Sequence, residues 1–215
     1  MAANFRRLGV FCGPSLPPED RRVLAGVSYL QPASRGDIAR ASAQYEALLV
    51  IDGVFHHDLA PSPKEVYAAC KRVRMFGASS MGALRAAECA PFGMLALGIV
   101  ARWYTSERID GDDEVALLVH PETQAALTVP LVNVRYVMRL AQRRGVLTTG
   151  NAEAAVKDAR AIFYMDRTWD AVLTRIPESA RAAVREIALR EGDLKRWDAR
   201  FALRAAMRHL RLSAS

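Results

Sequence analysis

The sequence predicts an α/β fold: an open, mostly parallel, Rossmann-like sheet with helices on both faces, followed by an all-helical C-terminal region. Three observations predict it. Over roughly the first 125 residues, short segments that are apolar throughout alternate with helix-like segments. After Pro130 the strand-like segments stop. The 215 residues are 51% hydrophobic and 25% charged, as in a packed globular protein. Because apolar strands separated by helices form parallel sheets covered on both faces, we predict an α/β core domain over residues 1–130 and a helical region over 131–215.

The elements of the core follow from short apolar runs and their flanking residues. Strands are expected over residues 8–12, 27–30, 47–51 and 73–76. Helices are expected over 38–45, over 63–72 and after Ser80. Asp37 is the expected N-cap of the first helix. Ser62 is the expected N-cap of the second, with Pro63 at its first position.

The C-terminal region is expected to be helical and basic. Helices are expected over residues 132–144, 152–164, 166–176, 178–190 and from Gly192 to about 210, with Asn151 as the cap of the second. The chain carries a net charge of +7, and residues 181–215 hold nine Lys and Arg against four Asp and Glu. This excess either docks an acidic protein, nucleic acid or an acidic membrane, or is a solvated helix face. The helical spacing of Trp197, Phe201, Met207 and Leu210 favours the second interpretation, with these four in the core.

The remaining composition excludes several classes of protein. No apolar run reaches the ~18 residues of a membrane span, and no signal peptide is expected at the N-terminus. The three cysteines, Cys12, Cys70 and Cys89, are far apart and form no C-x-x-C pair. We therefore expect no disulfide framework, no metal site and a reducing, cytoplasmic location. Phosphate-loop and dinucleotide glycine patterns are absent, so no nucleotide cofactor is expected.

Ligands of an open parallel sheet bind beyond the carboxyl ends of the strands, and this rule gathers four loops into one candidate site. The loops are Gly13-Pro14-Ser15, the 52–57 segment that contains Asp52, Gly53 and His57, the 77–82 segment, and the turn that ends at Asp37. The 77–82 segment is the most informative, because it places two serines between a strand and an Ala-rich helix. Unpaired N–H groups and the helix dipole there favour an anion or a developing oxyanion.

The two serines differ as candidate nucleophiles. A strict G-x-S-x-G elbow is absent. Ser80 has the small residues Ala78 and Gly82 two positions away on either side, as a sharp elbow demands, whereas Met81 would crowd Ser79. Ser80 is therefore the better candidate. The alternative is that either serine only caps the following helix.

Candidate acids and bases lie in two places. His56 and His57 follow the third expected strand, and the acids of residues 110–114 precede an apolar run that ends at His120. The order serine, acid, histidine is that of α/β-hydrolases, but the spacing is tighter. The alternatives are a surface histidine pair and an acidic turn before an edge strand over 115–119.

Two further residues each have a structural and a functional interpretation. Arg85 either pairs with Glu88 along the helix or holds a carboxylate. Cys12 either packs as a small apolar residue or acts as a thiolate nucleophile, and packing is the more usual role of such a cysteine.

Taken in order, several motifs resemble the TfuA-like family. They are Val10-Phe11-Cys12-Gly13-Pro14-Ser15-Leu16, Pro32-Ala33-Ser34-Arg35-Gly36-Asp37-Ile38, Ile51-Asp52-Gly53-Val54-Phe55, Phe76-Gly77-Ala78-Ser79-Ser80-Met81-Gly82-Ala83-Leu84-Arg85-Ala86-Ala87-Glu88 and Asp112-Asp113-Glu114-Val115-Ala116. The resemblance spans roughly residues 8–125, and the long serine motif is the most specific part. The sequence departs from the family pattern at Cys12, which counts against a catalytic role for that thiol.

The resemblance implies a role beside YcaO enzymes, which use ATP to activate a backbone amide when thioamides are made in ribosomal peptides or proteins. The TfuA-like partner is expected to release sulfide from a ThiS-like carrier that ends in a thiocarboxylate, and to assist engagement of the precursor peptide. The expected partners are therefore a YcaO enzyme, the carrier and the peptide, with no membrane and no nucleic acid.

Thiocarboxylate hydrolysis is an acyl transfer, and the candidate residues suit its parts. Ser80 would attack or position water, the N–H groups of Met81 and Gly82 would hold the oxyanion, and Asp52 or His57 would act as base. The full candidate set is Ser80, Ser79, Asp52 and His57 for catalysis, and Gly13, Pro14, Ser15, Asp37, Gly53, Met81, Gly82 and Arg85 for substrate binding. Two alternatives are a non-catalytic adaptor and, ranked last, a nucleic-acid-binding protein.

Overall fold

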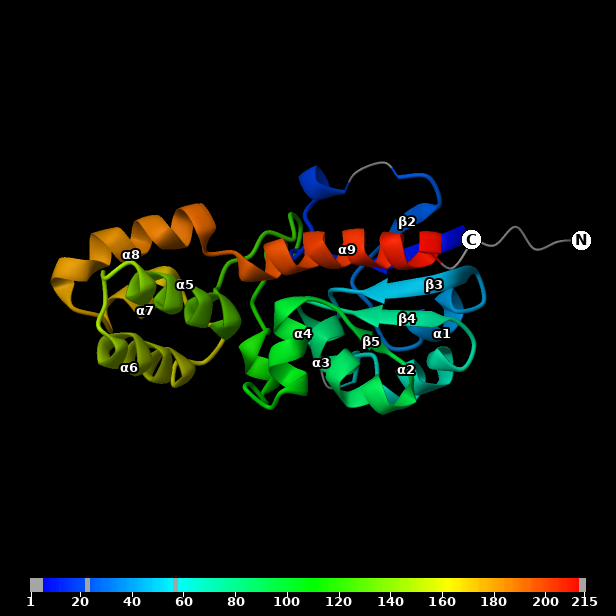
Figure 1. The fold of residues 1–215 in the computed structure, drawn as a ribbon, viewed down its shortest axis with the longest axis horizontal. Helices are drawn as coiled ribbons and strands as arrows, with labels where there is room; N and C mark the ends of the chain where they lie inside the picture. Colours follow the sequence, from blue (N-terminus) through cyan, green and yellow to red (C-terminus); the bar gives the residue numbers. More distant parts are fainter. Residues whose placement is uncertain (1–5, 22–23, 56–57, 213–215) are drawn as a thin grey trace, which may run out of the picture. The chain divides into compact units, whose positions relative to one another are not determined.

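The strands form one parallel sheet. The computed structural model describes residues 6–21, 24–55 and 58–212. Within them the sheet has five strands in the order β2-β1-β3-β4-β5, and every neighbouring pair is parallel (Figure 1). The bounds are β1 Arg6–Phe11, β2 Val27–Leu30, β3 Tyr45–Val50, β4 Arg74–Gly77 and β5 Leu95–Ala96. The predicted α/β class with an open parallel sheet is confirmed.

Helices connect the strands and follow them. The α-helices are α1 Asp37–Ala41, α2 Pro63–Cys70, α3 Met81–Cys89, α4 Gly98–Thr105, α5 Leu131–Arg143, α6 Thr149–Arg160, α7 Trp169–Leu173, α8 Glu178–Glu191 and α9 Leu194–Leu212. Short 3₁₀ turns cover η1 Pro18–Asp20, η2 Ala90–Phe92 and η3 Asp112–Glu114. Among the helices of the described ranges, none is both long and apolar enough to cross a membrane.

The chain divides into two compact units. The first unit contains residues up to Asp110 together with those from Arg196 onward, and the second unit is Gly111–Lys195. The sheet and most of α9 thus belong to the first unit. The predicted division into an α/β core domain over residues 1–130 and a helical region over 131–215 stays a prediction.

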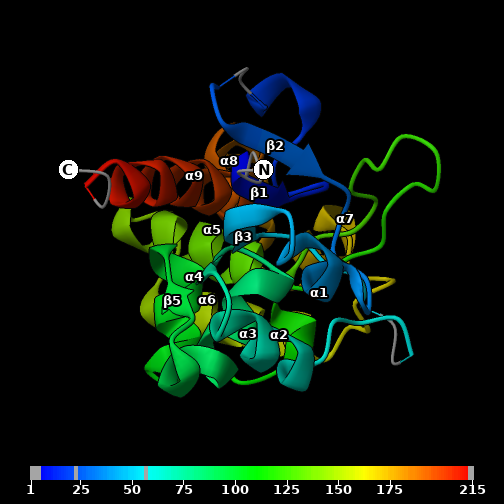
Figure 2. The same ribbon diagram turned by 90° about the vertical axis from the view of Figure 1, so that its right-hand side faces the viewer.

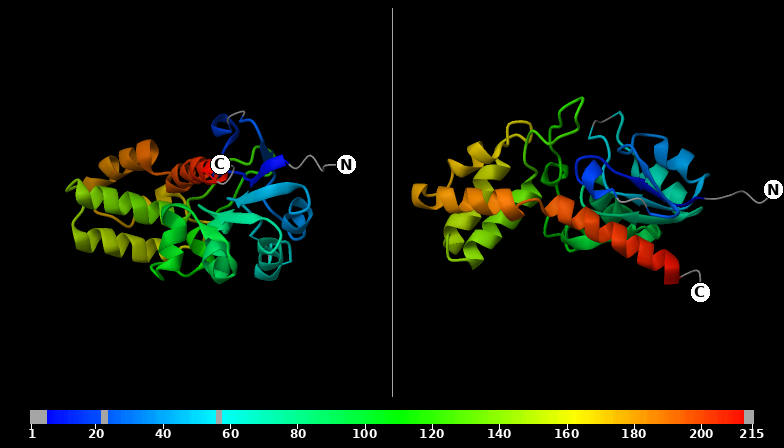
Figure 3. Two further views of the ribbon diagram at one scale, coloured as in Figure 1. Left: turned by 45° about the vertical axis from the view of Figure 1, so that its right-hand side comes forward. Right: turned by 90° about the horizontal axis from the view of Figure 1, so that it is seen from above.

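Helices cover both faces of the sheet, because successive strand residues point to opposite sides. Leu8, Val10, Ala47 and Leu49 pack on the face covered by α9. Leu48 and Val50 pack on the other face, with residues of α1, α2 and α3. Figures 2 and 3 show α9 on one side of the strands and α1 and α2 on the other.

The prediction that Trp197 and Phe201, in the first turns of α9, are buried in the core is wrong. Trp197 and Phe201 are 52% and 41% exposed, and their rings stack on each other with centroids 5.9 Å apart. The face of α9 that packs on the strands instead contains three alanines, Ala199, Ala202 and Ala206, together with Leu203 and Leu210. Alanines allow the helix to approach the sheet closely. Leu210 is buried as predicted, and Met207 is partly buried.

Two predicted helix caps are wrong, and one is confirmed. Ser62 caps α2, since its side chain accepts from the Glu65 N–H at 3.2 Å. The N-cap of α1 is Gly36, with a positive φ of 88°, and not Asp37. The Glu65 carboxylate accepts the N–H of Ala39 in the first turn as well as that of Gly36, so it takes the place of a capping side chain. The cap of α6 is Thr148 rather than Asn151, because the Thr148 hydroxyl accepts the Asn151 N–H.

Candidate functional site

The carboxyl ends of β1 and β3 meet at the point where the strand order reverses, which is where ligands bind in doubly wound sheets. Asp52 follows β3, and the loop Gly13-Pro14-Ser15 follows β1. One carboxylate oxygen of Asp52 accepts the N–H of Gly13 at 2.7 Å and of Ser15 at 3.1 Å. The other accepts the Ser15 hydroxyl at 2.6 Å. The structure therefore brings these predicted residues together.

Asp52 acts first as a clamp on this loop. Its side chain is buried and accepts three hydrogen bonds, and all three come from the Gly13–Ser15 loop. Pro14, in the same loop, is only partly buried. A buried carboxylate that is satisfied in this way fixes the position of the loop. Its use as a general base would require one of these hydrogen bonds to be exchanged for water or substrate.

The start of α3 lies directly against β3 and the loop after it. The Gly82 N–H donates to the Ile51 carbonyl at 3.1 Å. A Cβ at Gly82 would come within 1.8 Å of the Val50 carbonyl oxygen, so only glycine allows this approach. A Cβ at Gly53 would come within 2.8 Å of Met81 Cγ. The Gly82 N–H is therefore engaged and is not available to an oxyanion, whereas no described residue accepts the Met81 N–H.

The turn between β4 and α3 holds the two serines in unusual backbone conformations. Ser79 has a φ of 65°, in the left-handed region that non-glycine residues rarely adopt. Ser80 is the N-cap of α3, but its side chain makes no capping hydrogen bond. The capping interpretation is therefore wrong for the Ser80 hydroxyl. A strained turn between a strand and a helix is the setting in which hydrolases present a nucleophile.

Both serines are covered in this conformation of the protein. Ser79 is 0% exposed and Ser80 is 2% exposed. A ligand could contact the Ser80 Oγ only after the surrounding residues moved.

Asp198 belongs to this region and was not found from the sequence. It lies on α9, is fully buried, and one carboxylate oxygen accepts the Ser79 N–H at 3.1 Å. The other oxygen accepts the Ile99 N–H at 2.5 Å, at the start of α4. Burial raises the pKa of Asp198 from 3.8 to about 6, although hydrogen bonds from the Ile99 and Ser79 backbones oppose the rise. The one signal in the sequence is that Asp198 is the single acidic residue in 196–212, among five arginines.

Two other predicted residues, Arg85 and Asp37, have partners outside the serine turn and the Gly13–Ser15 loop. The Arg85 Nε donates to the Pro61 carbonyl at 2.8 Å, and its Nη1 pairs with Glu88 at 2.5 Å, as the structural interpretation predicts. Asp37 accepts the Ser34 N–H at 2.8 Å and pairs with an arginine one turn along α1. His57 lies outside the described residues, as does its neighbour His56.

Cys12 packs as an apolar residue. It lies in the core between the sheet and α9, and burial raises the pKa of its thiol to about 12. A thiol with that pKa stays protonated near neutral pH and is a poor nucleophile. The packing interpretation is confirmed.

The acidic segment before His120 is structural within the second unit. Glu114 is buried, and its carboxylate accepts hydrogen bonds from Nε and Nη2 of Arg135, at 2.8 and 2.6 Å. Asp113 pairs with the buried Arg167 at 3.3 Å. No strand forms over residues 115–119, so the expectation of an edge strand is wrong; Val119 makes only an isolated bridge to Ala126. These acids anchor the turn η3 to α5 and to the segment between α6 and α7.

A model of the TfuA-like protein family matches residues 52–168. The chain belongs to the TfuA-like protein family. The match covers the serine turn and continues through α5 and α6, so it extends beyond the motifs that carried the resemblance. TfuA-like proteins are associated with a role as partners of YcaO enzymes. A search of curated proteins finds no match to the chain.

The described part of this TfuA-like protein holds no group of three or more His, Cys, Asp and Glu side chains placed to bind a metal ion. The site therefore consists of the β4–α3 turn, the clamped Gly13–Ser15 loop with Asp52, and Asp198 behind Ser79.

Proposed function

We propose that this TfuA-like protein supports YcaO-dependent backbone thioamidation by releasing sulfide from the C-terminal thiocarboxylate of a ThiS-like carrier. The observation that supports it best is the strained β4–α3 turn, with Ser79 at φ 65° and the Ser80 side chain free of a capping bond. This turn lies at the carboxyl end of a parallel strand in a member of the TfuA-like family.

The chemistry is an acyl transfer in two steps. The Ser80 Oγ adds to the thiocarboxylate carbon and loses its proton to a base. The base returns this proton to the sulfur as the C–S bond breaks, which leaves an acyl serine and HS⁻. Water then cleaves the ester, regenerating the serine and leaving the carrier with an ordinary carboxylate. The Met81 N–H is the backbone donor for the oxyanion, since the Gly82 N–H is already bonded to Ile51.

The remaining candidates have supporting roles in this proposal. Asp52 holds the Gly13–Ser15 loop, and with Gly53 it would border the path of a glycine-rich carrier tail. Asp52 or His57 is the proposed general base. Arg85 would receive the thiocarboxylate charge only after exchanging one of its bonds, to Pro61 or Glu88.

The proposed partners are the YcaO enzyme, the sulfur carrier and the precursor peptide. The proposed location is the cytoplasm, where thiols such as Cys12, Cys70 and Cys89 stay reduced.

The test is incubation of the purified protein with a ThiS-like carrier thiocarboxylate. The mass of the intact carrier and the concentration of free sulfide are then measured over time. We expect catalytic loss of the thiocarboxylate, and its abolition in Ser80→Ala. The matched control is Ser42→Ala, because Ser42 is also buried and its hydroxyl donates to the Ala39 carbonyl on α1. Unchanged release by Ser80→Ala would remove Ser80 as the nucleophile, and Ser79→Ala would then be the decisive variant.

A second candidate function is a non-catalytic adaptor that presents peptide or carrier to the YcaO enzyme. The burial of both serines and the three hydrogen bonds on Asp52 favour it, because neither group is ready to react. An adaptor binds the carrier but leaves its mass unchanged, even when the YcaO enzyme is present.

A further inference from the structure

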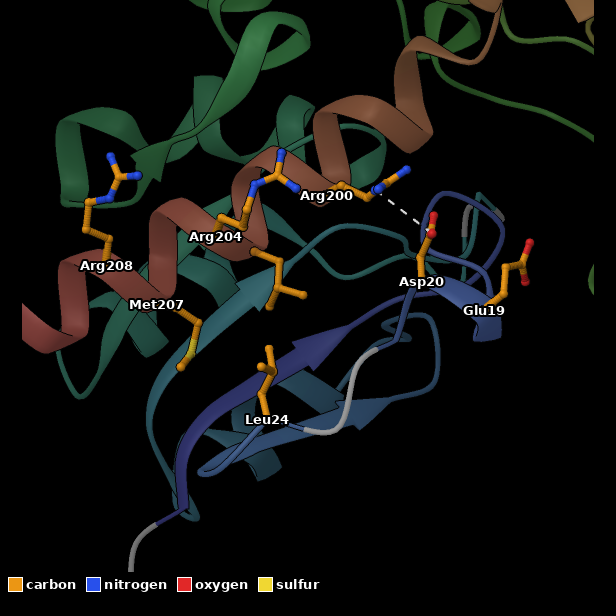
Figure 4. Close-up of a pocket in the computed structure, with 8 residues that line it drawn as sticks. Glu19, Asp20, Leu24, Arg200, Arg204, Met207 and Arg208 are labelled. Atoms are coloured by element: carbon orange, nitrogen blue, oxygen red, sulfur yellow. Dashed lines mark ion pairs between the residues drawn. The ribbon is translucent and has the colours of Figure 1, made fainter. Parts of the chain in front are cut away.

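A pocket of about 390 Å³ lies on the first unit, between α9 and the segment that contains η1 (Figure 4). Its volume is within the range of about 300–1,000 Å³ that is usual for ligand sites. The lining residues are Glu19, Asp20, Leu24, Arg200, Leu203, Arg204, Met207 and Arg208. None of them belongs to the serine turn or to the loops described above.

The floor of the pocket is apolar. Leu203 is buried in the core between α9 and the sheet, and Leu24 and Met207 are partly buried against the same core. Figure 4 shows Leu24 and Met207 pointing toward each other from opposite sides of the pocket. An apolar side chain of a ligand that enters between them would lose contact with water on both sides.

The two ends of the pocket differ in charge. At one end, Asp20 pairs with Arg196 at 2.6 Å, and its second carboxylate oxygen lies 3.9 Å from the Arg200 Nε. Glu19 also pairs with Arg196, at 3.3 Å. The acidic side chains at this end are therefore neutralised by arginines of α9.

At the other end the positive charge is not matched. Arg204 and Arg208 are exposed, and across the described ranges neither side chain forms an ion pair. They lie four residues apart on α9, so they follow each other by about 6 Å along the helix axis. Two exposed guanidinium groups beside an apolar floor suit a ligand that is both anionic and partly apolar.

An extended peptide matches this spacing. Side chains two positions apart in an extended chain lie on the same side, about 6.6 Å from each other, and the side chain between them points the opposite way. A segment with the pattern acidic, apolar, acidic can therefore place two carboxylates on Arg204 and Arg208 and its central side chain on the floor.

We propose that this pocket is a docking site for an acidic, extended peptide segment of a partner protein. A nucleic acid strand fits less well, because the apolar floor offers no aromatic ring on which a base could stack. The proposal is independent of sulfide release, since no residue of the pocket takes part in the proposed acyl transfer.

The test is fluorescence anisotropy of the whole protein with a fluorescein-labelled peptide of sequence Gly-Ser-Glu-Leu-Glu-Ser-Gly. We expect saturable binding that weakens with added salt. Binding should weaken at least about tenfold in Arg204→Glu/Arg208→Glu, since two attractive contacts become repulsive. The control is Arg139→Glu, which reverses one exposed charge on α5, in the second unit, and is not among the residues that line the pocket. It should leave the affinity unchanged.

Two further probes separate the features of the ligand. A peptide with glutamines in place of the glutamates should bind at least about tenfold more weakly if the charges act as proposed. A peptide with serine in place of leucine tests the apolar floor and should also bind more weakly. The proposal is overturned if the acidic peptide fails to bind or binds the double variant equally well. It is also overturned if labelled oligothymidylate, and not the peptide, binds in a manner that depends on Arg204 and Arg208.

Discussion

Substitution of Asp198 by asparagine tests the most unusual electrostatic feature of the fold. The carboxylate is fully buried and receives the N–H groups of Ser79 and Ile99 on separate oxygens. An amide has one acceptor oxygen, so Asp198→Asn turns an NH₂ group toward one of these N–H donors. The lost bond and the buried unsatisfied donor together should cost about 1–3 kcal/mol wherever Asp198 in the parent protein is protonated.

The pH dependence follows from the pKa of this group. Burial raises the pKa of Asp198 from 3.8 to about 6 in the folded protein, so the folded state binds the proton more tightly than the unfolded chain. The stability from this group is fully present below about pH 4, and it is lost as the pH rises to about 6. The loss amounts to about 3 kcal/mol. Asp198→Asn lacks this dependence.

The assay is urea unfolding of both proteins at pH 4, 5, 6 and 7. Trp169, which lies in the second unit, is replaced by Phe in both, so that the fluorescence of Trp103 and Trp197 reports on the first unit. We expect the variant to be less stable than its parent at pH 4 and to equal or exceed it at pH 7. A stability difference that stays constant from pH 4 to 7 would refute the reasoning. So would a carboxyl titration of Asp198 by NMR with a midpoint near 4.

Three further substitutions test the site by urea unfolding at pH 7. Ser15→Ala should lose about 1.5–3 kcal/mol, because the 2.6 Å hydrogen bond to the buried Asp52 carboxylate disappears. Gly82→Ala should lose about 3 kcal/mol or more, because the new methyl group would sit 1.8 Å from the Val50 carbonyl oxygen. Ser79→Val should be about 1–3 kcal/mol less stable than Ser79→Gly, because a β-branched residue disfavours a φ of 65°.

Each of these expectations has an outcome that contradicts it. Ser42→Ala is the reference for loss of a buried hydroxyl, and an equal loss from Ser15→Ala would argue against a special role for the carboxylate clamp. Wild-type stability in Gly82→Ala would show that α3 does not lie as close to β3 as described. Equal stability of the two Ser79 variants would remove backbone strain from the account of the turn.

The sheet could be predicted because its strands are continuous apolar runs bounded by turn residues. The second strand has the predicted bounds, Val27–Leu30, and the others differ by one or two residues at their ends. The rule that ligand loops follow the carboxyl ends of parallel strands also predicts that Gly13, Ser15 and Asp52 lie together, and the hydrogen bonds of Asp52 confirm it. These local patterns predict the order of strands and helices along the chain, and the end of the sheet at which the candidate loops lie.

Features that depend on distant residues or weak local patterns could not be predicted. Strand β5 has only two residues, too few for a periodic pattern, and so it was not predicted. Helix α4, which follows it directly, was not predicted either. Asp198 is 119 positions from Ser79, and nothing local shows that its carboxylate meets the serine turn. The buried face of α9 was misassigned because alanines form much of it, and alanine contributes little to an apolar pattern in which Trp197 and Phe201 stand out.

The first unit depends on the long helix α9, although α9 is far from the strands in the sequence. The side chains of β1 and β3 on one face of the sheet are covered by residues from Ala199 to Leu210, so a chain that stopped before α9 would expose that face to water. Asp198 would also be lost, leaving the buried N–H groups of Ser79 and Ile99 without their acceptor. A parallel sheet with one bare face does not form a stable core. We therefore expect the segment that resembles an appendage by sequence to be required both for the sheet and for the serine turn after β4.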